Sequence, residues 1–328
     1  MTIKNCLLKF AFGAIAVAVI LQSCSKDDDP SNPIIDDPEP DPEIVSIIQN
    51  IKSDSIQSYV QMLEDMGTRF ALASNRRDVA VAIMHKFESF GIDNVALDSF
   101  QLQEYYEREL YTTWQYNVVA TITGTVTPDS VYIIGGHHDC IVSSIDDPFT
   151  IVPGANDNAS GVATTLEIAR VLKLVDFTPK STIKFITFAA EELGLYGSWH
   201  YAGNASSSNE KIKMMLNNDM VAYWSLPDTS NWCVNIIDYS NSMALRVQAQ
   251  QACSTYTSLK TNNDNTYRAY SDSYPFAEYN YKALFFISND DDVNYHTLTD
   301  LTTACNFKFC REVAKVNCVL LVQNNSAN

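Results

Sequence analysis

The chain is 328 residues long, with 22 basic and 39 acidic side chains, so its formal net charge is 22 − 39 = −17. This excess of negative charge argues against nucleic acid or an anionic membrane surface as a binding partner. Hydrophobic residues make up 46% of the sequence, which is enough for a sizeable core, and the length allows one large or two ordinary domains.

The first residues predict a targeting segment rather than part of a folded domain. Lys4 supplies a positive charge, and the apolar run over residues 7–21 is shorter than a membrane-spanning helix needs. The run leads into Leu21-Gln22-Ser23-Cys24, which resembles the lipobox of bacterial lipoproteins except at Gln22. We therefore predict a lipoprotein signal peptide over residues 1–23 and lipidation of Cys24, with an ordinary secretory peptide as the alternative.

Residues 24–43 predict an extended tether between this lipid anchor and the domain. From Asp27 to Glu43 the sequence contains eight acidic residues, no basic ones and several prolines, so it cannot bury a core. Its first acidic run resembles the signal that sends some Gram-negative lipoproteins to the cell surface; a solvated acidic linker is the alternative. We expect an exported outer-membrane lipoprotein, surface-exposed or otherwise periplasmic, with one domain over residues 44–328.

Patterns of helix and strand alternate through the rest of the chain. Apolar residues recur at helical spacing in residues 43–66, 76–90, 159–175, 242–255 and 302–322. Alternating or continuous apolar runs predict strands over residues 95–102, 116–122, 131–134, 181–190, 213–220, 234–238 and 283–288. The alternation predicts an α/β fold, in which a mixed, mostly parallel central sheet carries helices on both faces.

Six cysteines follow Cys24: Cys140, Cys233, Cys253, Cys305, Cys310 and Cys318. An even number in an exported protein permits disulfides, but the sequence leaves their pairing open. None of them forms a C-x-x-C pair, so a thiolate metal site is not expected. Cys140 is interpreted as a small buried hydrophobic residue.

Imidazole and carboxylate groups follow several of the predicted strands. The candidates are His137, Asp139, Asp157, Glu191, Glu192, Asp219 and His296. Open α/β sheets place their chemistry at the carboxyl ends of strands, and charged groups there are costly to bury unless they are paired or metal-bound. Two imidazoles with several carboxylates form a ligand set suited to zinc. Their number suffices for two metals that share one carboxylate, with another carboxylate left as a base.

Five blocks in this order resemble the M28 family of zinc peptidases, which includes bacterial aminopeptidases with two co-catalytic zinc ions. The blocks are H-x-D from His137, G-x-N-D-N-x-S-G around Asp157, A-A-E-E-x-G-x-x-G-S around Glu191, N-x-D-M at Asp219 and Y-H-T-x-x-D around His296. The resemblance covers most of the chain from about Ile44. It implies the zinc-exopeptidase fold, also described as phosphorylase/hydrolase-like.

The resemblance also implies the metal ligands. His137, Asp157 and Asp219 would bind one zinc ion. Asp157, Glu192 and His296 would bind the other, so that Asp157 bridges the two ions.

Three further residues would take part in catalysis. Glu191 would be the general base, which takes a proton from the zinc-activated water and passes it to the leaving amine. Asp139 would orient His137 through its second ring nitrogen, and Tyr295 would donate a hydrogen bond to the developing oxyanion. The peptide bond after Asp157 is expected to be cis. One departure is Ser273, which stands where family members often have the histidine of S-D-H, so details of the substrate pocket remain open.

We therefore expect an exported aminopeptidase that acts on peptides with a free N-terminus. A glutaminyl cyclase-like enzyme with a single zinc is one alternative, although the continuation over residues 158–161 resembles the peptidases. A carboxypeptidase would need a basic pocket, and few arginines lie near the motifs. A non-catalytic binding module that resembles these peptidases would lack ligands, whereas all five ligands and Glu191 are present.

Overall fold

The computed structural model describes residues 39–143, 145–226 and 228–326. The predicted signal peptide, Cys24 and most of the predicted tether lie outside the described residues. None of the helices in the described part is long and apolar enough to cross a membrane. Helix α1 begins at Pro42, so the folded part starts inside the segment predicted as tether.

The elements follow in the order α1 (Pro42–Ile48), α2 (Ser53–Glu64), α3 (Arg76–Ser89), β1 (Asn94–Tyr106), β2 (Glu109–Ile122), β3 (Thr127–His137), η1 (Ala155–Ala159), α4 (Ser160–Leu174), β4 (Ser181–Phe188), α5 (Tyr196–Ser207), β5 (Lys211–Asn218), η2 (Thr229–Asn231), β6 (Cys233–Asp238), α6 (Met243–Tyr256), β7 (Lys260–Asn262), α7 (Ser273–Glu278), β8 (Ala283–Ser288), η3 (Thr302–Ala304) and α8 (Phe307–Asn325).

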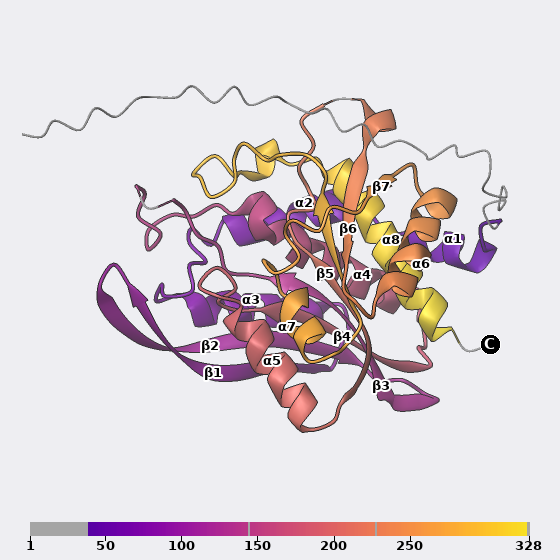
Figure 1. Cartoon of the computed structure of the whole chain (residues 1–328), viewed down its shortest axis with the longest axis horizontal. Coiled ribbons are helices and arrows are strands. Elements are labelled where there is room, and N and C mark those ends of the chain that lie inside the picture. Colours follow the sequence, from indigo (N-terminus) through magenta and orange to yellow (C-terminus); the bar gives the residue numbers. More distant parts are fainter. Residues whose placement is uncertain (1–38, 144, 227, 327–328) are drawn as a thin grey trace, which may run out of the picture.

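The strands form one sheet in the order β1-β2-β4-β3-β5-β8-β6-β7 (Figure 1). The four central strands β4, β3, β5 and β8 run parallel to one another. Antiparallel pairs join β1 to β2, β2 to β4 and β6 to β8, whereas β6 and β7 are parallel. The predicted mixed sheet with a parallel centre is confirmed.

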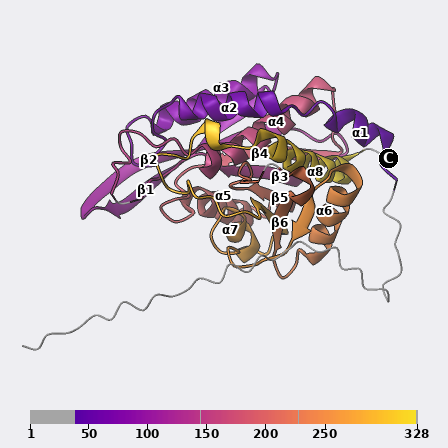
Figure 2. The same ribbon diagram turned by 90° about the horizontal axis from the view of Figure 1, so that it is seen from above.

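Helices cover both faces of the sheet. Figure 2 shows α2, α3 and α4 on one side of the strands and α5 and α7 on the other. Alternate residues of the central strands point to opposite faces: Phe185 and Leu216 pack against the first group, and Ile186 and Met215 against the second. Burial on both faces explains why these strands are nearly continuous apolar runs in the sequence.

The helix predicted over residues 43–66 is two helices, α1 and α2, with a break between them. At the break, the backbone N–H of Lys52 donates to the buried carboxylate of Glu167 at 2.7 Å, and Arg170 donates to the carbonyl of Asn50 at 2.8 Å. These bonds satisfy backbone groups that a continuous helix would have paired internally. The apolar period continues across the break, so the sequence did not reveal it.

β1 and β2 form a longer hairpin than predicted. Glu107 and Arg108 make the turn, both with positive φ (47° and 73°), as a tight hairpin turn requires. β2 runs antiparallel to β4, and its residue Val118 pairs with Thr187, the penultimate residue of β4. The part of β2 before Val118, and the part of β1 paired with it, therefore project past the carboxyl end of β4. Figure 1 shows the hairpin extending from the edge of the sheet. The hairpin therefore stands beside the edge where the candidate residues gather.

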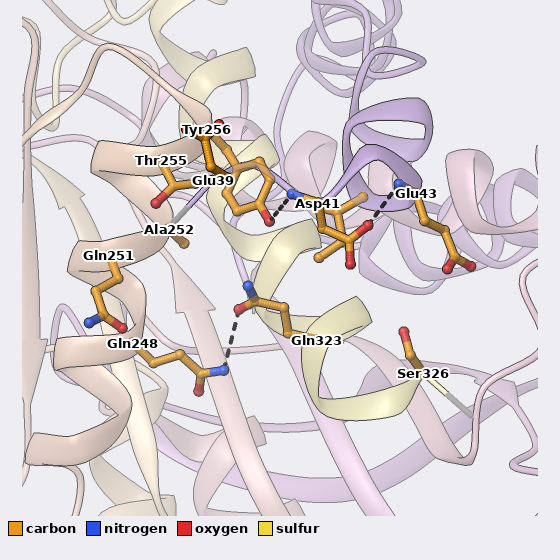
Figure 3. A pocket seen from close by; sticks show the side chains of 11 residues that line it. Glu39, Asp41, Glu43, Gln248, Gln251, Ala252, Thr255, Tyr256, Gln323 and Ser326 are labelled. Atoms are coloured by element: carbon orange, nitrogen blue, oxygen red, sulfur yellow. Dashed lines mark hydrogen bonds between the residues drawn. The ribbon is translucent and has the colours of Figure 1, made fainter. Parts of the chain in front are cut away.

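A cavity of about 330 Å³ lies between α1, α6 and the end of α8 (Figure 3). Its lining is acidic and amide-rich, with Glu39, Asp41 and Glu43 on one side. Tyr256 accepts a hydrogen bond from the backbone N–H of Asp41 at 3.1 Å. None of the predicted site residues lines this cavity, so it is separate from the candidate site.

Candidate metal centre

The five predicted ligands come together at the carboxyl edge of the parallel strands. His137 is the last residue of β3, Glu192 follows β4, and Asp219 follows β5 directly. His296 lies in the loop after β8, and Asp157 lies in the η1 turn that leads into α4. Because β4, β3, β5 and β8 are neighbours in the sheet, their following loops converge on one place.

Asp157 lies between the two imidazoles. Its Oδ1 is 3.3 Å from Nε2 of His137, and its Oδ2 is 3.2 Å from Nε2 of His296. Asp219 Oδ1 lies 3.4 Å from Nε2 of His137, and Glu192 Oε2 lies 3.0 Å from Nε2 of His296. Asp157 thus lies within 3.3 Å of both imidazoles, with Asp219 beside His137 and Glu192 beside His296. Donor atoms of His137, Asp157 and Glu192 also lie within 4.8 Å of one another, so Glu192 is within reach of a metal at His137 as well.

The clusters fit a divalent metal. Nitrogen and oxygen ligands lie about 2.0–2.2 Å from a tetrahedral zinc, which places them roughly 3.3–3.6 Å from one another. The observed separations of 3.0–3.4 Å are close to that value. One buried atom here, Glu192 Oε1, has no hydrogen-bond partner among the described residues. Such an atom is costly to bury, and a bound cation would remove that cost.

Charge crowding shifts the pKa values of these groups. Burial, with the charge of Asp157, raises the pKa of Glu192 to about 7. Burial lowers the pKa of His296, but the carboxylates of Asp157 and Glu192 outweigh it and raise the value to about 10. Burial raises the pKa of Glu191 well above its ordinary value. The centre contains more carboxylates than imidazoles, so its negative charge is only partly balanced. Divalent cations would balance the rest.

Glu191 is buried beside the cluster that contains His137 and Asp219. Its Oε2 lies 3.9 Å from Nε2 of His137, farther than the carboxylates of Asp157 and Asp219. Donor atoms of His137, Glu191 and Asp219 nevertheless lie within 4.8 Å of one another, so a carboxylate at position 191 is also within reach of a metal. The longer distance favours the predicted role of a base outside the ligand set.

Asp139 lies beside the second ring nitrogen of His137, as predicted, and it makes further contacts. Nδ1 of His137 lies 3.1 Å from the backbone oxygen of Asp139, whereas the carboxylate is 3.6 Å away. The carboxylate accepts the backbone N–H groups of Glu191 at 3.0 Å and of Glu192 at 3.2 Å. Residue 139 therefore orients His137 mainly through its carbonyl, and its side chain holds the segment that carries Glu191 and Glu192.

Tyr295 lies at the surface beside the cluster that contains Glu192 and His296. The residue is 50% exposed, and its ring stacks on that of His296, with ring centroids 3.8 Å apart. Burial of the hydroxyl raises the pKa of Tyr295, so this group remains protonated and able to donate. Its donation to an oxyanion stays a prediction.

The turn that carries Asp157 is tightly packed against the end of β5. The Asp157–Asn158 peptide bond is cis, as the resemblance implies. Asn158 donates to the carbonyl of Asn218 at 2.9 Å. A Cβ atom on Gly136 or Gly161 would lie 2.4 or 2.0 Å from that same carbonyl oxygen. Both positions therefore require glycine for the strand ends and the turn to approach each other.

Sequence reasoning missed Ser271, which holds one of the predicted ligands. The Ser271 hydroxyl donates to Asp219 Oδ2 at 2.6 Å and accepts from the side-chain amide of Asn217 at 2.5 Å. This arrangement fixes one carboxylate oxygen and leaves Oδ1 toward His137. The next residue, Asp272, is also buried, and burial raises its pKa to about 7. The sequence marked this segment only by its departure from S-D-H.

Ser271→Ala is expected to lower kcat roughly 10- to 100-fold, because Asp219 loses the bond that orients it toward the metal. Ser273→Ala is the matched control, since Ser273 is an equally buried hydroxyl that bonds Tyr239 instead of a ligand. Steady-state kinetics on both variants checks the prediction. Equal losses in the two variants would contradict it.

Arg69 is a buried cation beneath the centre. Its guanidinium donates to four backbone carbonyls: His138 at 2.9 Å, Leu63 at 3.2 Å, Pro153 at 2.8 Å and Gly154 at 2.7 Å. It joins the end of β3 to the loop that precedes Asp157. Because these bonds occupy the guanidinium, it is not free to bind the carboxylate of a substrate.

Arg69→Met is expected to lower the free energy of unfolding by at least about 3 kcal/mol, because several buried carbonyls lose their donor. Arg77→Met is the control, since the guanidinium of Arg77 lies over the Tyr116 ring on the surface. Urea denaturation of both variants measures the effect. If Arg69→Met lowers the free energy of unfolding no more than Arg77→Met does, the stabilising role of the Arg69 hydrogen bonds is contradicted.

One cysteine, Cys140, lies next to the centre. Cys140, next to Asp139, is fully buried, and burial raises its pKa to about 12. The free thiols among the described residues are Cys140, Cys253, Cys305, Cys310 and Cys318. The thiol of Cys140 therefore behaves as the small hydrophobic residue that the sequence predicted.

Comparison with known proteins adds a family match. Residues 117–321 match the model of Peptidase family M28. A protein of Leptosphaeria maculans named probable zinc metalloprotease is 34% identical over 195 residues, which cover 56% of this chain and 44% of that protein. One of Pyrenophora teres f. teres with the same description is 30% identical over 309 residues, covering 84% and 65%. The chain thus spans about half to two thirds of the length of these fungal relatives.

Solved structures support the fold. An aminopeptidase from Aneurinibacillus sp. strain AM-1 superposes with a TM-score of 0.74 at 18% identity, covering 87% of this chain and 97% of that one. A glutaminyl cyclase of Fimbriiglobus ruber gives 0.67 at 17% identity, covering 83% and 95%. The fold class is therefore confirmed, and it is shared by enzymes with different reactions.

Proposed function

The chain belongs to peptidase family M28, and from that premise we propose that it is a two-zinc aminopeptidase acting on the free N-terminus of peptides. The observation that carries the proposal is the pair of clusters joined by Asp157. A single-zinc enzyme would not need both His137 with Asp219 and His296 with Glu192. All of these side chains are present and close together.

In this proposal each residue has a defined task. His137, Asp157 and Asp219 would hold one zinc, and Asp157, Glu192 and His296 would hold the other. Zinc supplies Lewis-acid activation of water and of the scissile carbonyl.

Proton transfer is the task of Glu191. Its Oε2, which faces His137, accepts a proton from the attacking water and returns it to the nitrogen of the leaving amine. Asp139 keeps this carboxylate in place through the backbone of residues 191 and 192. The Tyr295 hydroxyl donates to the oxyanion that develops on the carbonyl oxygen.

The charge around the centre supports action at the N-terminus. Glu191, Asp219 and Asp272 are buried carboxylates in a region with more carboxylates than cations, and their negative charge would favour a protonated α-amino group over a second carboxylate. Arg69, the buried cation beneath the centre, is occupied by four backbone carbonyls and is not available to the terminal carboxylate that a carboxypeptidase would have to bind.

A panel of substrates tests the proposal on the purified protein. Aminoacyl p-nitroanilides with a free amine should be hydrolysed, and their N-acetylated counterparts should not, because acetylation removes the positive charge. Equal cleavage of both forms would point to an endopeptidase. Conversion of an N-terminal glutamine peptide to pyroglutamate, without amide cleavage, would establish the cyclase alternative.

We also propose that the protein is exported and anchored to the outer membrane through lipid on Cys24. The support is the sequence of residues 1–24 alone. Labelling of cells with a radioactive fatty acid should mark the wild-type protein and not Cys24→Ser. Equal labelling of both would contradict the anchor.

A further inference from the structure

Asp300 is a buried carboxylate that the mechanism above does not use. It is 2% exposed and ends the Y-H-T-x-x-D block. Its Oδ1 accepts the backbone N–H of Asn156 at 2.7 Å, and its Oδ2 accepts that of Asp157 at 2.9 Å. Its backbone oxygen accepts the N–H of Ala155 at 3.0 Å. One residue thus binds three successive N–H groups of the turn that carries the shared ligand.

The same residue belongs to the loop of the other ligand. Asp300 lies four positions after His296, and its N–H donates to the carbonyl of Thr297 at 3.2 Å. The bonds of Asp300 therefore connect the two segments that carry His296 and Asp157. Those ligands meet at 3.2 Å between Nε2 and Oδ2. If the connection is lost, this separation is no longer held by the backbone.

The arrangement parallels that of Asp139. Each is a buried carboxylate whose two oxygens accept two successive backbone N–H groups, residues 191 and 192 for Asp139 and residues 156 and 157 for Asp300. Each pair of N–H groups includes that of a predicted ligand, Glu192 or Asp157. Charged acceptors make stronger hydrogen bonds than neutral ones, which suits them to hold loops around a metal.

We propose that Asp300 is a positioning residue that sets the zinc affinity of the cluster formed by Asp157, Glu192 and His296. The proposal rests on the function proposed above for this centre. Asn at position 300 is nearly the same size, but only one of its two side-chain atoms can accept a hydrogen bond. Its amide nitrogen would face a backbone N–H, so the turn loses one of its two anchors.

Competition of the metal-free protein with a zinc-binding dye tests the proposal. Asp300→Asn should weaken at least one of the two zinc-binding steps roughly 10- to 100-fold, as loss of a partner that orients ligands does. At limiting zinc, bound metal should fall toward one ion per chain, and added zinc should restore kcat. Asp290→Asn is the matched control, because the Asp290 carboxylate also accepts a backbone N–H, that of Ser225, which is not a predicted ligand.

Wild-type zinc affinity in Asp300→Asn would overturn the proposal, even if the variant melts at a lower temperature. If that variant does not fold, Asp300→Glu keeps both acceptors but displaces them, and the same titration decides. If the wild-type protein binds one zinc only, the two-zinc function fails, and the affinity of that single ion in Asp300→Asn still tests the positioning role. If the wild-type protein binds no zinc, both the two-zinc function and the positioning role of Asp300 are overturned.

Discussion

Glu191→Gln is expected to lower kcat roughly 10²- to 10⁴-fold while both metal positions stay filled. Glutamine has nearly the same size, and the backbone bond from residue 191 to Asp139 is unaffected by the change. What is lost is the carboxylate oxygen that accepts the proton. Steady-state kinetics and metal analysis by mass spectrometry on the same preparation measure the two quantities.

Glu278→Gln is the control for this variant, since it removes an exposed carboxylate at the end of α7. Retention of nearly full activity in Glu191→Gln would overturn the assignment of the base. Loss of one metal together with activity would instead make Glu191 a ligand, which its 3.9 Å distance from His137 leaves within reach.

Asp157→Ala is expected to abolish activity and to remove both metals. Its two carboxylate oxygens face different imidazoles, so both clusters lose a ligand at once. A tetrahedral zinc site with three protein ligands loses much of its affinity when one of them is removed. The zinc content of the folded variant, after dialysis against a weak chelator, should fall below one ion per chain.

Asp219→Ala provides the contrast, because the Asp219 carboxylate forms an ion pair with His137 and, among the described residues, not with the other imidazole. This variant should lose one metal and keep the other. One tightly bound zinc in both variants would show that Asp157 belongs to a single cluster. Circular dichroism on each variant separates loss of metal from loss of fold.

Much of the fold follows from local patterns. β8 and α4 lie within a residue of their predicted bounds, because each is an apolar run with clear ends. The break between α1 and α2 depends on Glu167 and Arg170, which are more than a hundred positions away. The second half of β1 is rich in Gln, Glu and Tyr, and it is a strand because it pairs with β2. Contacts between distant segments decide such features.

In the candidate site, too, some residues could be recognised from the sequence and others only from the structure. The five ligands and Glu191 could be selected because their side chains carry the chemistry and stand in ordered motifs. Ser271, Arg69 and Asp300 act through hydrogen bonds to other segments, which a single sequence does not display. Asp139 was selected as the partner of His137, which it contacts. The bonds from its carboxylate to the backbone of Glu191 and Glu192 could not be seen in the sequence.

Titration of zinc into the metal-free protein, with hydrolysis of an aminoacyl p-nitroanilide followed at each addition, tests the central claim most directly. The two clusters joined by Asp157 predict that two zinc ions bind per chain and that full activity requires both. Saturation at one zinc, with full activity at that point or with none at any point, would contradict the two-zinc aminopeptidase.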